Sequence, residues 1–205
     1  MNTTNLIGKN GRISVRMMTL TALLSAISTV VMLFEFPLPF APNFYRLDLS
    51  EIVVAIGAFT LGPVAGVTIE LLKNLLNLLI NGTSTAGVGE FANFAIGCAF
   101  IIPASVIYRK TNSFKGALIG LAAGTLSLVA VGSLMNYYLL IPLYAKAFNA
   151  PIDAFVQMGN AINKSIVDLK TLVLFATAPF NLVKGVVASV ATLVSYKKLS
   201  AVLHK

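Results

Sequence analysis

The sequence predicts an all-α membrane protein with six transmembrane helices, and three observations lead to that class. Hydrophobic residues make up 57% of the 205 residues and charged residues only 11%, whereas a soluble domain is about 25% charged. The apolar runs are long enough for membrane helices, and they lack the short alternating pattern of a β-barrel. The basic residues also gather in particular loops, as membrane topology requires. This composition excludes a soluble globular protein, a disordered protein and a coiled coil.

The first predicted span covers residues 17–36 and follows a basic N-terminal arm. No small-residue cleavage site comes after it, so we interpret it as a membrane helix and not as a signal peptide. Pro37 and Pro39 end it, because proline cannot continue the helical hydrogen-bond ladder. A long first outer loop then leads to the second span.

The second span is short for a full crossing and begins within that loop. Gly62 and Pro63 break the chain directly after it. We expect residues 1–205 to form a single integral membrane domain. Its spans after the first are 49–61, 65–80, 90–108, 116–144 and 171–196.

The distribution of basic residues predicts that both termini are cytoplasmic. Nine of the fifteen Lys and Arg residues lie in the N-terminal arm, between spans four and five, and in the C-terminal tail. Only four lie on the opposite side, and Lys73 and Lys184 fall within spans. The positive-inside rule places the richer side in the cytoplasm. The net charge of +8 is therefore mostly a topological signal and not a nucleic-acid-binding surface.

Small residues recur every four positions on two spans. Ala22 and Ala26 lie on the first, and Gly116, Gly120 and Gly124 lie on the fifth. This spacing lets helix backbones approach closely in lipid. It fits packing within the chain or a groove for a partner subunit, and the position of Ala22 and Ala26 near the cytoplasmic side favours the partner slightly.

Several kinds of chemistry are excluded by what the sequence lacks. The lone Cys98 cannot form an internal disulfide, and the lone His204 cannot build a histidine metal site or a catalytic triad. No phosphate-binding P-loop sequence occurs, so the chain does not itself hydrolyse ATP. We expect no catalytic residues, no metal site and no cofactor.

Polar side chains inside the apolar spans are the candidates for function, because each is costly in lipid unless it is paired. In one interpretation the charged ones form structural bridges with one another. In the other, residues of the outer halves of spans five and six converge on a pocket for a flat, uncharged or weakly charged molecule. An intramembrane enzyme using Glu70 with Lys73, or Glu90 alone, is a weaker alternative. The candidate polar residues, in and directly beside the spans, are Glu70, Lys73, Asn74, Asn77, Asn81, Glu90, Asn93, Asn136, Asn181 and Lys184.

Three stretches together resemble a known family. They are Ala22-x-x-x-Ala26, the loop FPLPFAPNFYRLDLSE at 36–51, and FNLVKG at 180–185. The chain resembles the substrate-binding (S) components of energy-coupling factor (ECF) vitamin transporters, and among these the riboflavin-specific subgroup. The resemblance covers nearly the whole sequence. The last two stretches carry the likeness to the riboflavin subgroup.

This resemblance implies a bacterial cell-membrane protein that captures riboflavin as a transported ligand. Its partners would be a transmembrane coupling subunit, which Ala22 and Ala26 would contact, and two cytosolic ATPases. The first loop would act as a lid over the pocket, and the role of Arg46 in it is open. An S component for a thiamine- or pyridoxine-like vitamin remains the alternative, and a stand-alone secondary transporter is disfavoured because no internal repeat is visible. The implied ligand contacts are Asn181, Lys184, Asn136, Asn93, Glu90, Phe44, Tyr45 and Leu47.

Overall fold

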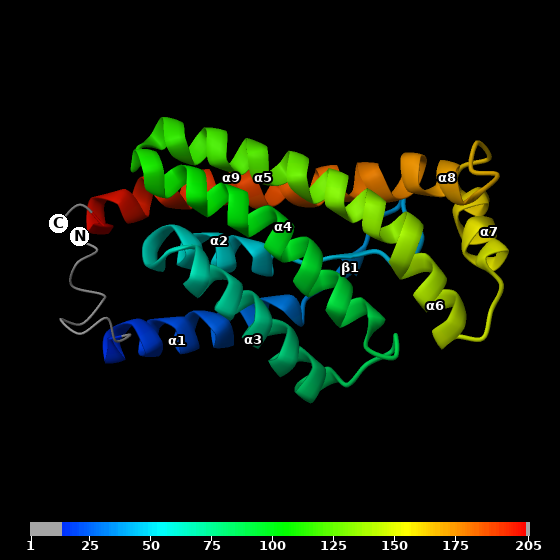
Figure 1. Cartoon of the computed structure of the whole chain (residues 1–205), viewed down its shortest axis with the longest axis horizontal. Coiled ribbons are helices and arrows are strands. Elements are labelled where there is room, and N and C mark those ends of the chain that lie inside the picture. The colour runs from blue at the N-terminus through cyan, green and yellow to red at the C-terminus, as the bar shows by residue number, and fades with distance from the viewer. Residues whose placement is uncertain (1–13, 204–205) are drawn as a thin grey trace.

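The computed structural model describes the backbone of residues 14–203 and the side chains of residues 14–195. Part of the topology argument rests on Lys9, Arg12 and Lys205, which lie outside the described residues, as does His204. Within the described part, the long helices run side by side along the long axis of the molecule (Figure 1).

Five helical segments are long and apolar enough to cross a membrane. Large apolar side chains such as Leu79, Leu126 and Val194 are more than half exposed on their outer faces, as expected for helices that face lipid. The all-α membrane class predicted from composition is confirmed. The five segments are α1 (Val15–Met32), α3 (Pro63–Asn81), α4 (Val88–Thr111), the continuous run Phe114–Ala147 and the continuous run from Leu169 through α9.

The short second span predicted from the sequence is α2 (Ser50–Leu61), which has 12 residues. Gly62 follows it with φ 107°, a backbone conformation that favours glycine, and Pro63 is the first residue of α3. The turn at Gly62 lies at the same end of the molecule as the start of α1 and the turn between α4 and α5 (Figure 1). We call this the basic end, because Arg16, Arg109 and Lys110 lie there.

Two long helices each contain one wider, π-helical turn, which the sequence did not predict. The run Phe114–Ala147 consists of α5 (Phe114–Met135), η2 (Asn136–Leu140) and α6 (Ile141–Ala147). The last run consists of α8 (Leu169–Leu172), η3 (Val173–Thr177) and α9 (Ala178–Leu203). Pro142 and Pro179 each follow a π turn by two residues. Each proline lacks the N–H that an α-helix needs, so a carbonyl in the turn before it has no α-helical partner.

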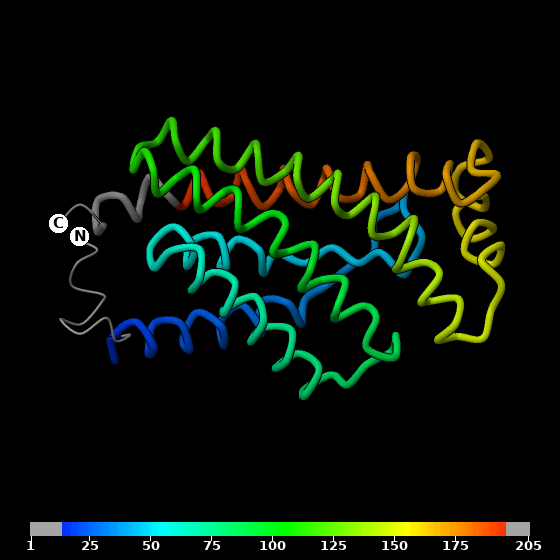
Figure 2. The backbone as a smooth tube through the Cα atoms, viewed as in Figure 1, coloured from blue at the N-terminus to red at the C-terminus, as the bar shows by residue number. Residues whose placement is uncertain are grey.

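The first loop enters the bundle instead of remaining on its surface. It contains a short antiparallel pair, β1 (Phe36–Pro37) with β2 (Arg46–Leu47). Tyr45, Leu47 and Asp48 are buried. The tube in Figure 2 shows this segment passing from α1 across the bundle and back to the start of α2. Its buried positions therefore form part of the protein interior.

The stretch between the last two spans contains α7 (Ile152–Ile162), where the sequence analysis expected only a polar segment. Phe155, Val156 and Gly159 form its buried face. The helix lies across the end of the bundle opposite the basic end (Figure 1). We call this opposite end the loop end.

The small-residue stripes have different surroundings. Gly120 and Gly124 lie against the backbone carbonyls of Ala104 and Phe100 on α4, so the stripe on α5 serves packing within the chain. Ala22 and Ala26 are exposed on α1. Of the two stripes, only the one on α1 is left free for a partner.

Candidate ligand-binding site

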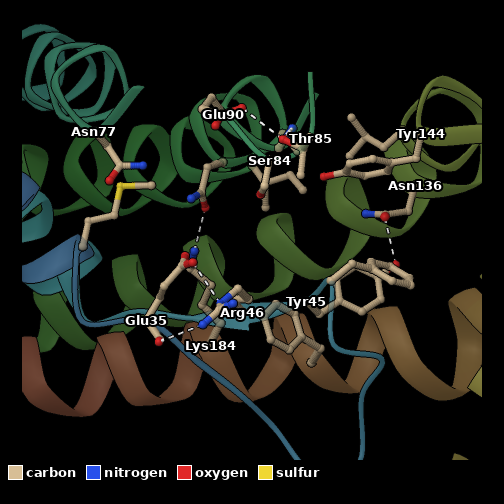
Figure 3. Close-up of a pocket in the computed structure, with 18 of the residues that line it drawn as sticks. Glu35, Tyr45, Arg46, Asn77, Ser84, Thr85, Glu90, Asn136, Tyr144 and Lys184 are labelled. Carbon is tan, nitrogen blue, oxygen red and sulfur yellow. Dashed lines mark hydrogen bonds and ion pairs between the residues drawn. The ribbon is translucent and has the colours of Figure 1, made fainter. Parts of the chain in front are cut away.

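A cavity of about 210 Å³ opens between the first loop, the loop-end halves of α3 and α4, the η2 and α6 part of the run Phe114–Ala147, and the first turns of α9. Its wall combines aromatic side chains with many polar ones (Figure 3). The polar and charged side chains of the wall are Glu35, Arg46, Asn77, Asn81, Ser84, Thr85, Glu90, Asn93, Asn136, Asn181 and Lys184.

Lys184 of α9 is buried at the wall and is held from two sides. Its Nζ donates to Asn93 Oδ1 of α4 at 2.9 Å and forms an ion pair with Asp48 Oδ2 of the first loop at 3.2 Å. Asp48 Oδ1 accepts from the Ser50 N–H at 2.9 Å and also bonds the Ser50 hydroxyl. The lysine therefore joins the loop to two membrane helices while its side chain still lines the cavity.

Tyr45 joins the first loop to both π turns. Its hydroxyl donates to Asn136 Oδ1 of η2 at 2.9 Å and lies 2.6 Å from the Thr177 hydroxyl of η3. Its ring stacks on Phe180, with centroids 5.2 Å apart. Figure 3 shows Tyr45 and Asn136 joined across the cavity wall. The widened turns thus carry the groups that hold the loop in place, in line with the frequent occurrence of π turns at functional sites.

Asn181 is buried at the wall, one turn of α9 before Lys184. Its Nδ2 has no hydrogen-bond partner in the described part of the chain. Gly132 of α5 faces this amide, and a Cβ at that position would collide with it. A buried amide without a partner is costly. Its place in the wall makes it available to a ligand acceptor.

The rim of the cavity carries two acidic side chains in different surroundings. Glu35 forms an ion pair with Arg46, with Oε1 and Nε 2.9 Å apart. Partial burial raises the pKa of Glu35 above its ordinary value, and the positive charge of Arg46 opposes this shift. Glu90 accepts from the hydroxyls of Thr83 and Thr85 at 3.2 and 3.1 Å. The structure therefore gives Arg46 a partner, which the sequence could not.

A second group of charges lies beside the cavity but does not line it. Lys73 is fully buried, with Glu70 Oε2 at 2.7 Å and Glu51 Oε1 at 3.1 Å. The structural-bridge interpretation is therefore correct for Glu70 and Lys73. It is wrong for Glu90, whose partners are hydroxyls. Because Glu70 and Lys73 are closed off from the cavity, the pair proposed for an enzyme cannot meet a ligand there.

Most of the site residues expected from the sequence meet at this cavity. Asn181, Lys184, Asn136, Asn93, Glu90, Phe44 and Tyr45 all line it. Leu47 does not; it is buried in a cluster with Ala41, Tyr45 and Phe180. The contributors that the sequence analysis missed include Asp48, Glu35, Tyr144 and Phe180. Asp48 and Glu35 flank the loop positions that were chosen, and an unpaired Lys184 was a signal that a nearby acid was needed.

Comparisons with known proteins identify the family of this chain. The family model "ECF transporter, substrate-specific component" matches residues 16–196. The chain belongs to this family. The resemblance found in the sequence is thereby confirmed, and members of the family are transporter components and not enzymes.

Individual relatives of this substrate-specific component are similar over most of their length. "Riboflavin transporter RibU" of Staphylococcus aureus is 36% identical over 93% of each chain. "Riboflavin transporter FmnP" of Bacillus subtilis is 35% identical, over 90% of this chain and 92% of its own. A solved chain, described as "Structure and mechanism of the S component of a bacterial ECF transporter", superposes with a TM-score of 0.72 at 33% identity. The match covers 93% of this chain and 98% of that one.

Proposed function

We propose that this chain is the riboflavin-binding S component of an ATP-driven ECF transporter and mediates riboflavin uptake across the bacterial cell membrane. The observation that carries the proposal is the cavity, which brings Asn181 and Lys184 of α9 together with Asn136 and Asn93 at one wall. Relatives named as riboflavin transporters support the choice of ligand.

The chemistry of the wall suits a flavin. The ring system of riboflavin is flat and has one edge that both donates and accepts hydrogen bonds. Asparagine amides offer both functions, and the lysine is a donor. Asn181, with its free Nδ2, and Lys184 would bind that edge, and the rings of Tyr45 and Phe180 offer stacking faces.

The first loop would act as a lid that moves when the ligand enters. The cavity measures about 210 Å³, while sites for drug-sized ligands usually measure about 300–1,000 Å³. Tyr45 occupies the wall where Asn136 would otherwise be free. Displacement of Tyr45 would enlarge the cavity and release the Asn136 carbonyl for the ligand.

The six-span topology and the partners belong to the same proposal. Five long helices and the short α2 would give six crossings with cytoplasmic termini, so that the loop end faces outward. Ala22 and Ala26, exposed on α1, would contact the transmembrane coupling subunit, which would in turn bind two cytosolic ATPases. An Ala22→Leu variant should bind riboflavin normally and fail in uptake; lost binding would assign Ala22 to the packing of the chain itself.

The test of the ligand assignment is a riboflavin titration of the purified protein and its Asn181→Ala variant. Removal of a hydrogen bond to a buried ring group costs about 1–3 kcal/mol, so we expect affinity to fall by about one to two decades. Quenching of flavin fluorescence measures binding, and a melting curve verifies folding. Thiamine serves as the comparison ligand. Absence of riboflavin binding by the folded wild-type protein would refute the proposal, and thiamine binding would redirect it.

A further inference from the structure

The basic end of the molecule carries positive charge that no acidic residue offsets. It is formed by the start of α1, the α2–α3 turn, the α4–α5 turn and the end of α9 (Figure 1), and none of the seven acidic residues of the sequence falls in these segments. Arg16, Arg109, Lys110 and Lys115 lie there and are all exposed. The ion pairs among the described residues include none of these four. A surface with charges of one sign attracts an anionic partner.

Two of these cations lie beside the α2–α3 turn. A Cβ on Gly62 would collide with Nη1 of Arg109, so the guanidinium of this α4 residue lies directly against the glycine backbone of the turn. Met17 of α1 packs against the small apolar cluster that contains Leu61, the last residue of α2. Arg16 precedes Met17 and therefore begins beside the same turn. The two arginines come from different helices but flank one short segment.

Exposed apolar side chains border these arginines. Val64 directly follows the turn and is 74% exposed, while Val15 and Met18 of α1 are 79% and 60% exposed. On a membrane protein such side chains contact lipid acyl chains, and long basic side chains at the helix ends reach the headgroups. This part of the surface therefore offers both kinds of contact that a phospholipid needs.

We propose that the basic end is a binding surface for anionic phospholipids, with the headgroup phosphate at Arg109 and Arg16 and an acyl chain along Val64. The planar guanidinium binds phosphate oxygens through paired N–H donors. Clustered basic residues between membrane helices are a recurrent setting for anionic headgroups. A zwitterionic lipid also carries a cation, which finds no carboxylate at this end, so lipids with a net negative charge are preferred. This preference does not depend on which ligand fills the cavity.

The experiment measures which lipid the full-length protein retains in detergent, by native mass spectrometry. Phosphatidylglycerol and phosphatidylcholine with the same acyl chains are offered in equal amounts, and we expect the wild type to prefer phosphatidylglycerol. Arg109→Gln and Arg16→Gln should each lower that preference about fivefold, the effect of one basic residue near anionic headgroups. Lys146→Gln removes an exposed lysine near the loop end and is the matched control. It should leave the preference within about twofold, because distant exposed charges are screened.

A melting curve of each variant separates lipid binding from folding, because Arg109 also covers the turn. Arg109→Lys keeps the charge and should retain most of the preference. If Arg109→Gln does not fold, Arg16→Gln and Arg109→Lys decide the question. Raising the ionic strength should weaken the preference of the wild type, since salt screens exposed charges.

Several outcomes would overturn the proposal. One is equal retention of the two lipids by the folded wild type, and another is a preference that neither arginine variant lowers. An equal loss in Lys146→Gln would mean that total charge, and not this end, selects the lipid. Displacement of the lipid by inorganic phosphate at the same concentration would assign the arginines to a soluble anion. If the arginine variants kept the lipid preference but failed to assemble with the coupling subunit, the basic end would contact an acidic protein surface instead.

Discussion

The two buried lysines of this protein show how similar residues can serve different purposes. Lys73 on α3 and Lys184 on α9 both lie in apolar helices, and both are paired with carboxylates. Lys73 is fully enclosed, with two glutamates as partners. Lys184 has one carboxylate and one amide within hydrogen-bond distance, and its side chain lines the cavity. The difference between the two regions is access: a ligand can compete for the bonds of Lys184, but not for those of Lys73.

The two regions are nevertheless neighbours. Glu51 pairs with Lys73 at 3.1 Å and lies 3.9 Å from the Nζ of Lys184. Glu51 is in the first turn of α2, directly after the first loop. The enclosed charges therefore anchor the start of α2, and this anchor positions Asp48 against Lys184. We infer that the enclosed charges around Lys73 support the geometry of the cavity wall at Lys184. Variants that change only one of the two lysines test this inference.

Removal of the enclosed lysine should have the largest effect. Lys73→Met would leave Glu70 buried without a cation, and Glu51 would keep only Lys184, 3.9 Å away. Breaking a buried ion pair by removing one partner costs about 3–5 kcal/mol. We expect a strongly lowered melting temperature in detergent and a poor yield of folded protein. Lys164→Met, which changes an exposed lysine outside the bundle, should melt like the wild type.

A double variant tests whether charge is the cause. Adding Glu70→Gln to Lys73→Met removes the carboxylate left without a cation, so part of the lost stability should return. A double variant less stable than either single one would show that side-chain packing, and not charge, dominates this region.

Removal of the accessible lysine should affect binding more than folding. In Lys184→Met, Asp48 keeps its bonds to Ser50, so the loop retains part of its anchor. Hydrogen bonds to charged groups contribute about 1.5–3 kcal/mol, so riboflavin affinity should fall by about one to two decades. The measurement is a flavin titration with a parallel melting curve. If Lys184→Met melted at as low a temperature as Lys73→Met, and its folded fraction bound riboflavin normally, both lysines would serve folding and neither would bind the ligand.

Much of this comparison was accessible from the sequence. Hydropathy and the break at Gly62 predicted the helices, and the polar positions within them identified Asn136, Asn181 and Lys184. The sequence could not show that Glu51 completes the pair of Lys73, because Glu51 begins a helix instead of interrupting one. Nor could it connect Asp48 to Lys184 across 136 positions. Pairing over such distances depends on how helices pack, which local patterns do not encode.

The π turns and α7 were missed for a different reason. Proline within an apolar helix does not by itself predict a π turn, since Pro103 lies inside α4 without one. The widened turns at η2 and η3 bring Asn136 and Thr177 toward Tyr45, so tertiary contacts accompany them. In α7, the apolar residues are too few for a spanning segment, and an analysis directed at spans passed over it.

A smaller effect is expected from the loop tyrosine, which tests whether the bonds that close the cavity compete with the ligand. Tyr45→Phe removes the hydroxyl that engages Asn136 and Thr177 and keeps the ring against Phe180. A neutral hydrogen bond contributes about 0.5–1.5 kcal/mol, so its loss should raise riboflavin affinity by roughly two- to tenfold. Titration and association rates measure this effect. A fall in affinity would instead mean that the hydroxyl itself contacts the ligand.

The smallest effect should come from a carboxylate that is exposed, which completes the contrast with the buried charges. Asp168 precedes α8 and accepts from the Thr171 N–H at 2.7 Å. That backbone hydrogen bond, together with the Thr171 hydroxyl, lowers the pKa of Asp168 below its ordinary value. The ionised form is therefore favoured by folding. Its contribution is present above the ordinary pKa and is lost as the pH falls through the lower folded value.

We accordingly expect Asp168→Ala to lower the melting temperature by only a few degrees at pH 7, as loss of a helix cap does. The difference from the wild type should shrink as the pH falls below about 4, where the aspartate begins to lose its charge. Asp168→Asn, which can still cap the helix, should remain close to the wild type throughout. Melting curves over a pH series measure all three proteins. If Asp168→Ala lowered the melting temperature as much as Lys73→Met, the start of α8 would be as important for the fold as the enclosed charges. The exposure of a charged residue would then not predict how strongly its loss destabilises this protein.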